Sequence, residues 1–201
     1  MTPLIGKTLS ELQELVTSLG EPRFRGKQIA EWLYQKRATS IEEMTNLSKS
    51  FRAKLAENYQ VGRTPFSHRQ ISTDGTEKYL FPLLANPAYQ FETVYIPESS
   101  RATLCISSQV GCKMACSFCA TGKMGWLANL SSADIINQVL SIPHFDKLTN
   151  LVFMGMGEPL DNYDEVAKEI EILTADYGLA WSPKRITVST IGVKEGLNRL
   201  L

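Results

Sequence analysis

The four cysteines of this 201-residue chain lie within a single short segment, and their spacing is its strongest chemical signal. They occupy positions Cys105, Cys112, Cys116 and Cys119. An even number of cysteines in a secreted protein often indicates disulfides. These cysteines are too close together for a disulfide scaffold, however, and the first residues carry no pattern of a secretory signal. The cysteines therefore predict a metal site.

The last three cysteines form a CxxxCxxC motif in which the aromatic Phe118 stands directly before the final thiol. Structural zinc sites usually take their ligands from two separated pairs, and neither His68 nor His144 shows ligand spacing. Three thiolates can bind three irons of a cubane cluster and leave the fourth iron without a protein ligand. Such an iron can chelate a small molecule and pass an electron to it. The motif therefore predicts a 4Fe-4S cluster, with an unusual zinc loop as the alternative.

The overall composition excludes several classes of protein. With 43% hydrophobic and 21% charged residues, the chain is neither intrinsically disordered nor collagen-like. No uncharged apolar run approaches the roughly 20 residues that a membrane-spanning helix needs. The sequence therefore predicts a cytoplasmic protein without a membrane partner.

The charges balance overall, but they are unevenly distributed along the chain. Residues 1–90 contain 12 Lys and Arg against 9 Asp and Glu, whereas residues 91–201 contain 9 against 12. A mild basic patch is typical of phosphate contacts, and a solvated helix face would explain it equally well. The candidate phosphate-contacting residues are Arg23, Arg25, Lys27, Lys36 and Arg37, followed by Lys49, Arg52 and Lys54.

Residues 1–60 show helical patterns. Thr8 and Glu11 form a capping box, which is followed by apolar residues on one helical face and by Gly20 as a stop signal. Further helical segments are expected at residues 26–36, 40–43 and 47–55. This part of the chain is therefore predicted to be a small helical domain.

The pattern changes to strands near residue 67, where Asp74 and Gly75 predict a hairpin turn. We place the domain boundary near residues 88–100, with domains at 1–90 and 91–201, although the hairpin could belong to either domain. The segments expected to alternate between strand and helix are 91–96, 102–106, 131–141, 150–154, 163–177, 185–189 and 194–201. This alternation predicts an α/β fold with parallel strands and right-handed crossovers, after an N-terminal part of α+β type.

Ligands of α/β folds bind at the carboxyl ends of the parallel strands. The cysteine loop, the turn at Gly157 and Glu158, and Ser189 are all expected at such ends. The sequence therefore predicts one site that combines these three features.

Six stretches of the chain carry a family resemblance: PRFRGKQIAEWLY, the DGT hairpin, ETVYIPESSRATLCISSQVGC, CSFCATGKMG, FMGMGEPL and ITVSTIGV. Together they closely resemble the RlmN/Cfr family of radical S-adenosylmethionine (SAM) RNA methyltransferases. The resemblance implies a helical accessory domain that contacts RNA, followed by the first half of a partial (β/α)6 radical-SAM barrel. It also implies methylation of carbon 2 of an adenosine in 23S rRNA, with tRNA as a further candidate and an external electron donor.

The resemblance assigns cofactor roles to two groups of residues. The residues expected to hold the 4Fe-4S cluster, whose open iron takes the amino and carboxylate groups of SAM, are Cys112, Cys116 and Cys119. Gly157 and Glu158 match the motif that contacts the amino group of SAM, where a carboxylate suits a cationic ammonium. Ser189 matches a further contact to SAM.

Two more residues match catalytic positions of the family. Glu92 matches the proton acceptor, although a polar strand position explains it equally well. Cys105 matches a thiol that resolves the covalent RNA adduct by forming a disulfide with a methyl-carrier cysteine, and an inert buried cysteine is the alternative. The family places the carrier near its C-terminus, and this sequence offers no cysteine for that role. We therefore expect the chain to be truncated and unable to complete methyl transfer alone. The alternatives are a carbon-8 methyltransferase of the Cfr type and a non-catalytic Fe-S or RNA-binding fragment.

Overall fold

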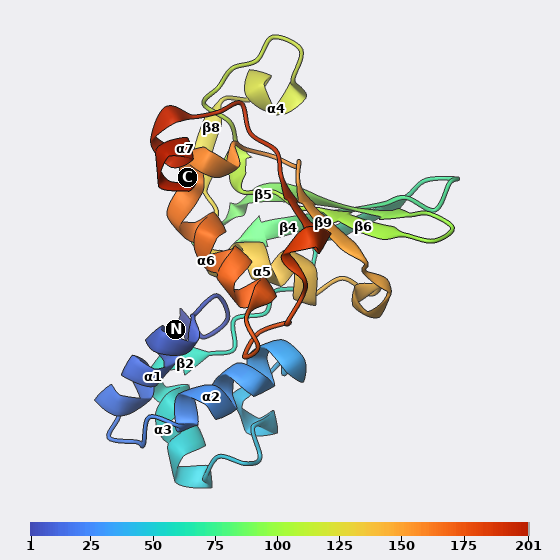
Figure 1. Cartoon of the computed structure of the whole chain (residues 1–201). Helices are drawn as coiled ribbons and strands as arrows, with labels where there is room; N and C mark the ends of the chain where they lie inside the picture. The colour runs from blue at the N-terminus through green and yellow to red at the C-terminus, as the bar shows by residue number, and fades with distance from the viewer. Residues whose placement is uncertain (201) are drawn as a thin grey trace.

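The computed structural model describes residues 1–200, and Leu201 lies outside the described part. The N-terminal helices form one lobe and the large β-sheet belongs to the other, with α5 and α6 lying between them (Figure 1). No helix in the described part is long and apolar enough to cross a membrane.

The N-terminal lobe contains the helices that the sequence predicts. The capping boxes at Thr8 with Glu11 and at Ser40 with Glu43 are both present and start their helices. The helices are α1 (Leu9–Ser18), α2 (Arg25–Ala30), the π-helical turn η1 (Glu31–Gln35), the 3-10 turn η2 (Ile41–Glu43) and α3 (Lys49–Asn58). Two short parallel strands, β1 (Thr2–Pro3) and β2 (Tyr59–Gln60), join the two ends of this lobe.

A six-stranded mixed sheet with the order β10-β9-β6-β5-β4-β3 forms the centre of the second lobe. Its strands are β3 (His68–Ile71), β4 (Glu77–Leu83), β5 (Asn86–Pro97), β6 (Ala102–Cys105), β9 (Asn150–Phe153) and β10 (Ile186–Val188). β6, β9 and β10 are parallel, as the strand–helix alternation predicts, whereas β3 to β6 form antiparallel pairs.

The sheet corrects one expectation about domain organisation. The boundary expected at residue 90 falls inside β5, and the hairpin β3–β4 continues the same sheet as the parallel strands. The reason is the long ladder between β4 and β5, which joins the hairpin to the α/β part. The N-terminal lobe is therefore helical, and the hairpin belongs to the sheet.

The remaining elements cover the sheet or flank its end. Short turns η3 (Phe145–Lys147), η4 (Pro159–Asn162) and η5 (Pro183–Arg185) connect longer elements. These longer elements are β7 (Gln109–Gly111), α4 (Ala120–Lys123), β8 (Trp126–Asn129), α5 (Ser132–Leu140), α6 (Tyr163–Thr174) and α7 (Lys194–Leu200).

Helix α5 covers one face of the sheet and is buried along its whole length. One of its buried polar residues, Gln138, bonds to the sheet and to the segment after β6. The Gln138 side chain accepts from the Thr93 hydroxyl (2.7 Å) and the Ser107 N–H (2.8 Å), and donates to the Ser107 carbonyl (3.0 Å). The opposite face of the sheet is half-exposed, because alternate residues of β4, β5, β6 and β9 point away from α5.

Candidate functional site

The three motif cysteines lie in the loop that joins strand β7 to the one-turn helix α4. β7 leads into the loop, α4 follows it, and β8 returns antiparallel to β7. Gly111 has a positive φ of 76°, and a Cβ there would lie 1.8 Å from the carbonyl oxygen of Gly125, so a side chain would not fit. The Cys112 N–H donates to the Gly125 carbonyl (3.1 Å), and the Cys119 N–H donates to the Cys116 carbonyl (3.1 Å). The backbone of the loop is therefore held by local hydrogen bonds.

The three thiols are free and half-buried, and they lie within eight consecutive residues of one loop. Burial raises the pKa of the Cys112 thiol, and the charges of Glu158, Cys116 and Cys119 raise it further. Within residues 1–200, no three His, Cys, Asp or Glu side chains are grouped to hold a single metal ion. The three thiolates of a cubane site need not point at a single ion, because each thiolate binds a different iron. Three neighbouring soft donors on one loop fit a 4Fe-4S cluster, which these cysteines would hold.

The turn after β9 packs directly on the segment that leads into the cysteine loop. A Cβ on Gly155 would lie 2.7 Å from the Ile106 carbonyl oxygen, and one on Gly157 would lie 2.5 Å from the Gln109 Cβ. Gly157 also has a φ of 99°, which a residue with a side chain rarely adopts. The glycines are therefore required for close approach of the two segments. Backbone N–H groups of Ser108 and Gln109 donate to the Met156 carbonyl (2.9 and 3.1 Å) and complete this contact.

The Glu158 carboxylate is buried, and it joins the turn to the segment after β10. Oε1 accepts from the Leu160 N–H (3.0 Å) and from the Thr190 hydroxyl, and Oε2 accepts from the Ile191 N–H (3.1 Å). Both oxygens therefore have donors within the chain, although a carboxylate can accept more bonds than these three. Sequence reasoning missed this role of Thr190 and Ile191. The available signal was that a buried carboxylate needs partners.

Ser189 follows β10 and is exposed. Its neighbour Thr190 contacts Glu158, so the fold brings residues 189–191 beside the Gly157–Glu158 turn. The cysteine loop, this turn and Ser189 thus lie at the carboxyl ends of β6, β9 and β10, as the alternating pattern predicts.

Cys105 and Glu92 lie on the same half-exposed face of the sheet, on neighbouring strands. Val94 is the direct partner of Cys105, and Glu92 precedes Val94 by two residues, so the three side chains share one face. Burial raises the pKa of the Cys105 thiol, and a hydrogen bond from the Met154 backbone partly offsets that effect. Lys78 Nζ lies 3.1 Å from Glu92 Oε1, while Oε2 has no hydrogen bond within residues 1–200.

Most of the candidate phosphate-contacting residues already have partners inside the protein. The partners are Gln13 for Arg23, Gln28 and the Asn46 carbonyl for Arg25, Glu31 for Lys36, Asp146 for Arg37, the Glu42 carbonyl for Arg52 and the Leu19 carbonyl for Lys54. Lys27 and Lys49 are exposed and have neither an ion pair nor a side-chain hydrogen bond in the described chain. The helices therefore present fewer free cations than the sequence indicates.

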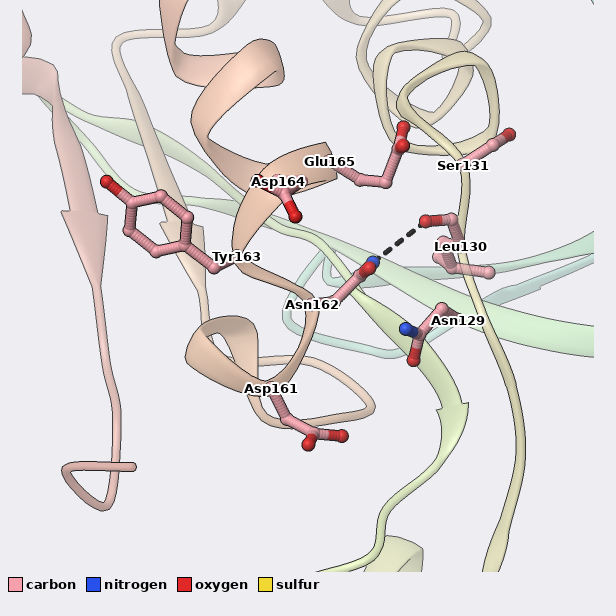
Figure 2. Close-up of a pocket in the computed structure, with 8 residues that line it drawn as sticks. All are labelled: Asn129, Leu130, Ser131, Asp161, Asn162, Tyr163, Asp164 and Glu165. Carbon is pink, nitrogen blue, oxygen red and sulfur yellow. Dashed lines mark hydrogen bonds between the residues drawn. The ribbon is translucent and has the colours of Figure 1, made fainter. Parts of the chain in front are cut away.

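A hollow of about 420 Å³ lies between the start of α6 and the segment that enters α5 (Figure 2). Asn162 crosses its floor and donates to the Ser108 carbonyl (2.9 Å) and the Leu130 carbonyl (2.8 Å). Asp161, Asp164 and Glu165 line it, so its charge is negative and unsuited to a phosphate. Its importance lies in two of its lining residues, Asn129 and Asp161, which connect to the cysteine loop.

A three-cysteine loop at the carboxyl ends of parallel strands defines a radical SAM protein. The family model for the radical SAM superfamily matches residues 106–200. The crystal structure of a radical SAM methyltransferase from Sphaerobacter thermophilus superimposes with a TM-score of 0.89 at 37% identity, covering 100% of this chain and 60% of that chain. The predicted α/β class with a partial barrel is thereby confirmed.

The family follows from the N-terminal lobe and from the curated relatives. The family model described as "Ribosomal RNA large subunit methyltransferase N-terminal domain" matches residues 2–61. A "Probable dual-specificity RNA methyltransferase RlmN" of Bacteroides thetaiotaomicron is 60% identical over 199 residues, which are 99% of this chain and 57% of that protein. The "Dual-specificity RNA methyltransferase RlmN" of Geobacter sulfurreducens is 46% identical over 200 residues, covering 100% of this chain and 55% of that protein. The chain belongs to the RlmN family, and it spans a little over half the length of these relatives.

Proposed function

We propose that this protein serves the methylation of carbon 2 of an adenosine in RNA by radical SAM chemistry. The observation that carries the proposal is the packing of the segment that leads into the three-thiol loop against the Gly157–Glu158 turn at the strand ends. The names of the relatives, RNA methyltransferases of dual specificity, support an RNA substrate. Within that class we propose 23S rRNA as the substrate and tRNA as a further candidate.

Cys112, Cys116 and Cys119 hold the 4Fe-4S cluster in this proposal. When bound, the cluster supplies an electron, received from an external donor, and an open iron for the amino and carboxylate groups of SAM. The backbone at Gly157 and the buried Glu158 then provide oxygen acceptors for the ammonium group of SAM, and Ser189 provides a hydroxyl at the next strand end. Charge-assisted hydrogen bonds of this kind are stronger than neutral ones.

Cys105 and Glu92 act on the RNA base. Glu92 accepts the proton that leaves the ring, and its Oε2, which has no hydrogen bond in the described chain, is available for it. The Cys105 thiol would form a disulfide with the sulfur of the methyl-carrier cysteine, while the carbon–sulfur bond of the adduct breaks and the released carbon takes up a proton to become the methyl group. All four cysteines are thereby assigned, so none remains for the methyl carrier. We propose that the 201-residue chain binds the cluster and SAM but does not complete methyl transfer alone.

Anaerobic reconstitution of the chain with iron and sulfide tests the cofactor part of the proposal. We expect about four irons and four sulfides per chain, and an electron paramagnetic resonance (EPR) signal of the reduced cluster that SAM perturbs. Cys116→Ser should lose most of the iron, whereas the matched variant Cys105→Ser should keep it. Zinc in place of iron, or equal iron in both variants, would contradict the assignment and favour a non-catalytic module.

The RNA chemistry needs a second experiment. The chain alone should give no methylated adenosine in rRNA or tRNA, and robust turnover would contradict our assignment of the cysteines. A chimera in which this chain replaces the matching part of the Bacteroides thetaiotaomicron relative tests the position of methylation. Mass spectrometry of digested RNA should find 2-methyladenosine, and 8-methyladenosine would overturn the proposal in favour of Cfr-type chemistry.

A further inference from the structure

A buried amide links the strand that enters the cysteine loop to two other segments. Gln109 is fully buried, and its side-chain nitrogen donates to Asn129 Oδ1 on β8 (2.8 Å) and to Asp161 Oδ2 on η4 (2.7 Å). Its side-chain oxygen accepts from the Glu158 N–H (2.9 Å). One side chain therefore connects both strands of the hairpin around the loop with the Gly157–Glu158 turn.

A lysine extends this connection into the cysteine loop itself. Lys113, the residue after Cys112, places its Nζ 3.0 Å from Asp161 Oδ2, the same oxygen that accepts from Gln109. The ammonium also lies 4.6 Å from the centre of the Trp126 ring, a distance typical of a cation–π contact. Among the side chains of residues 113–118, Lys113 alone makes an ion pair within residues 1–200.

The tryptophan closes the network. Trp126 Nε1 donates to Asn129 Oδ1 (3.1 Å), which also accepts from Gln109. Asn129 and Asp161 both line the hollow in Figure 2, so the network lies between this hollow and the cysteine loop. Asp161 is largely buried, with 19% of its side chain exposed, whereas 45% of the Lys113 side chain is exposed.

We propose that Lys113, Asp161 and Gln109 are positioning residues that set the distance between the cysteine loop and the Gly157–Glu158 turn. The inference rests on the proposed function, in which SAM must reach the open iron and the turn at the same time. A small change in that distance weakens one of the two contacts, because SAM can then no longer fit the open iron and the turn at the same time. The network itself does not touch the ligand.

Substitutions at Lys113 and Asp161 test the proposal better than one at Gln109, because replacement of the fully buried Gln109 would also alter folding. Lys113→Met removes the charge and keeps an apolar side chain over Trp126. Asp161→Asn removes the anion and keeps an oxygen acceptor for Gln109. The matched control is Lys123→Met, since Lys123 is exposed on the neighbouring helix α4 and has no ion pair in the described part.

The readouts are iron per reconstituted chain, thermal midpoint, the dissociation constant of SAM from equilibrium dialysis, and the change that SAM causes in the EPR signal. We expect all three single variants to retain iron and a thermal midpoint close to that of the wild type. Lys113→Met and Asp161→Asn should each weaken SAM binding about fivefold, the upper range for an exposed ion pair, and Lys123→Met should not. The double variant should lose no more than either single variant, because both substitutions break the same pair.

Two results would overturn the inference. One is SAM binding equal to the wild type in both single variants. The other is a double variant whose loss is the product of the two single losses, which would show that the residues act independently. A wild-type chain that binds neither cluster nor SAM would instead refute the proposed function. Failure of the inference alone leaves cluster and SAM binding by the wild type intact, so the two failures are distinguishable.

Discussion

The buried carboxyl of Glu169 gives a prediction that can be worked out from the structure. Glu169 lies on α6, fully buried, and neither of its oxygens has a hydrogen-bond partner within residues 1–200. Burial therefore raises its pKa well above the ordinary value. Burial raises the pKa of Tyr34 in the N-terminal lobe well above its ordinary value, and the charge of Glu169 raises it further; the Tyr34 hydroxyl donates to the Lys7 carbonyl (2.6 Å). Helix α6, which carries Glu169, lies between the two lobes (Figure 1).

The sign of the pH effect follows from proton binding. Above roughly pH 4.3 the unfolded chain releases the proton of this carboxyl, while the folded chain keeps it up to its raised pKa. The folded state then binds more protons than the unfolded state. The free energy of unfolding therefore falls by about 1.4 kcal/mol for each pH unit between the two pKa values. The stabilising contribution is complete at low pH and is lost as the pH rises.

Glu169→Gln removes this dependence at nearly constant shape. Near pH 4.5 the variant should be no more stable than the wild type. Above that pH the stability difference should move in favour of the variant by about 1.4 kcal/mol per pH unit, until the pH reaches the raised pKa of Glu169. Urea unfolding of the metal-free, reduced chain between pH 5 and pH 8, followed by circular dichroism, measures the difference. Other titrating groups are common to both proteins and cancel in that difference.

The control is Glu57→Gln, which removes one carboxylate from the exposed side of α3. Its stability difference from the wild type is the baseline against which the pH slope of Glu169→Gln is compared. A pH-independent difference for Glu169→Gln, or a wild type that is the more stable protein at pH 7.5, would refute the reasoning.

Three further predictions concern the turn, the sheet and the RNA surface. Gly157→Ala should destabilise the fold by at least about 1 kcal/mol in urea unfolding, because of its positive φ and the contact with Gln109. A second turn, at Gly192, has a positive φ of 84° without a neighbour within 4 Å, so Gly192→Ala should cost less. Burial by itself would raise the pKa of Glu77, but bonds from Arg69, Tyr79 and His144 outweigh it and hold the pKa at about 2. Glu77→Gln should therefore cost roughly 1–3 kcal/mol at pH 7. That cost should shrink as the pH falls from about 5 toward 2, since the folded chain then loses the same interaction by protonation. Changing Lys27 and Lys49 together to Glu should weaken RNA binding and flatten its salt dependence in filter-binding titrations.

Each of these predictions has a contrary result. Equal stability of the two glycine variants would show that the contact with Gln109 does not matter. A loss in Glu77→Gln that stays constant down to pH 3 would remove the ion pair as its cause. RNA binding with an unchanged salt slope would mean that the N-terminal helices do not contact the phosphates.

Local signals in the sequence predicted most of the elements correctly. The capping boxes at Thr8 and Ser40 depend on residues three positions apart, so the sequence alone specifies where these helices begin. The alternation of strand and helix after residue 100 likewise predicted the parallel strands β6, β9 and β10. The hairpin turn at Gly75 was also correct, but the sequence left open which domain the hairpin belongs to, because strand pairing joins residues distant from the turn.

The spacing of the three motif cysteines by itself determined the kind of ligand this protein is suited to bind, because chemistry of that kind depends on residue types in one short loop. The tertiary structure alone decided the surroundings of the loop. It paired most basic side chains of the N-terminal lobe within the protein and gave the Glu158 carboxylate donors from after β10. It also placed the Gln109 amide between the loop and the turn. Hydrogen bonds such as these connect residues 32 to 52 positions apart, so local sequence patterns do not encode them.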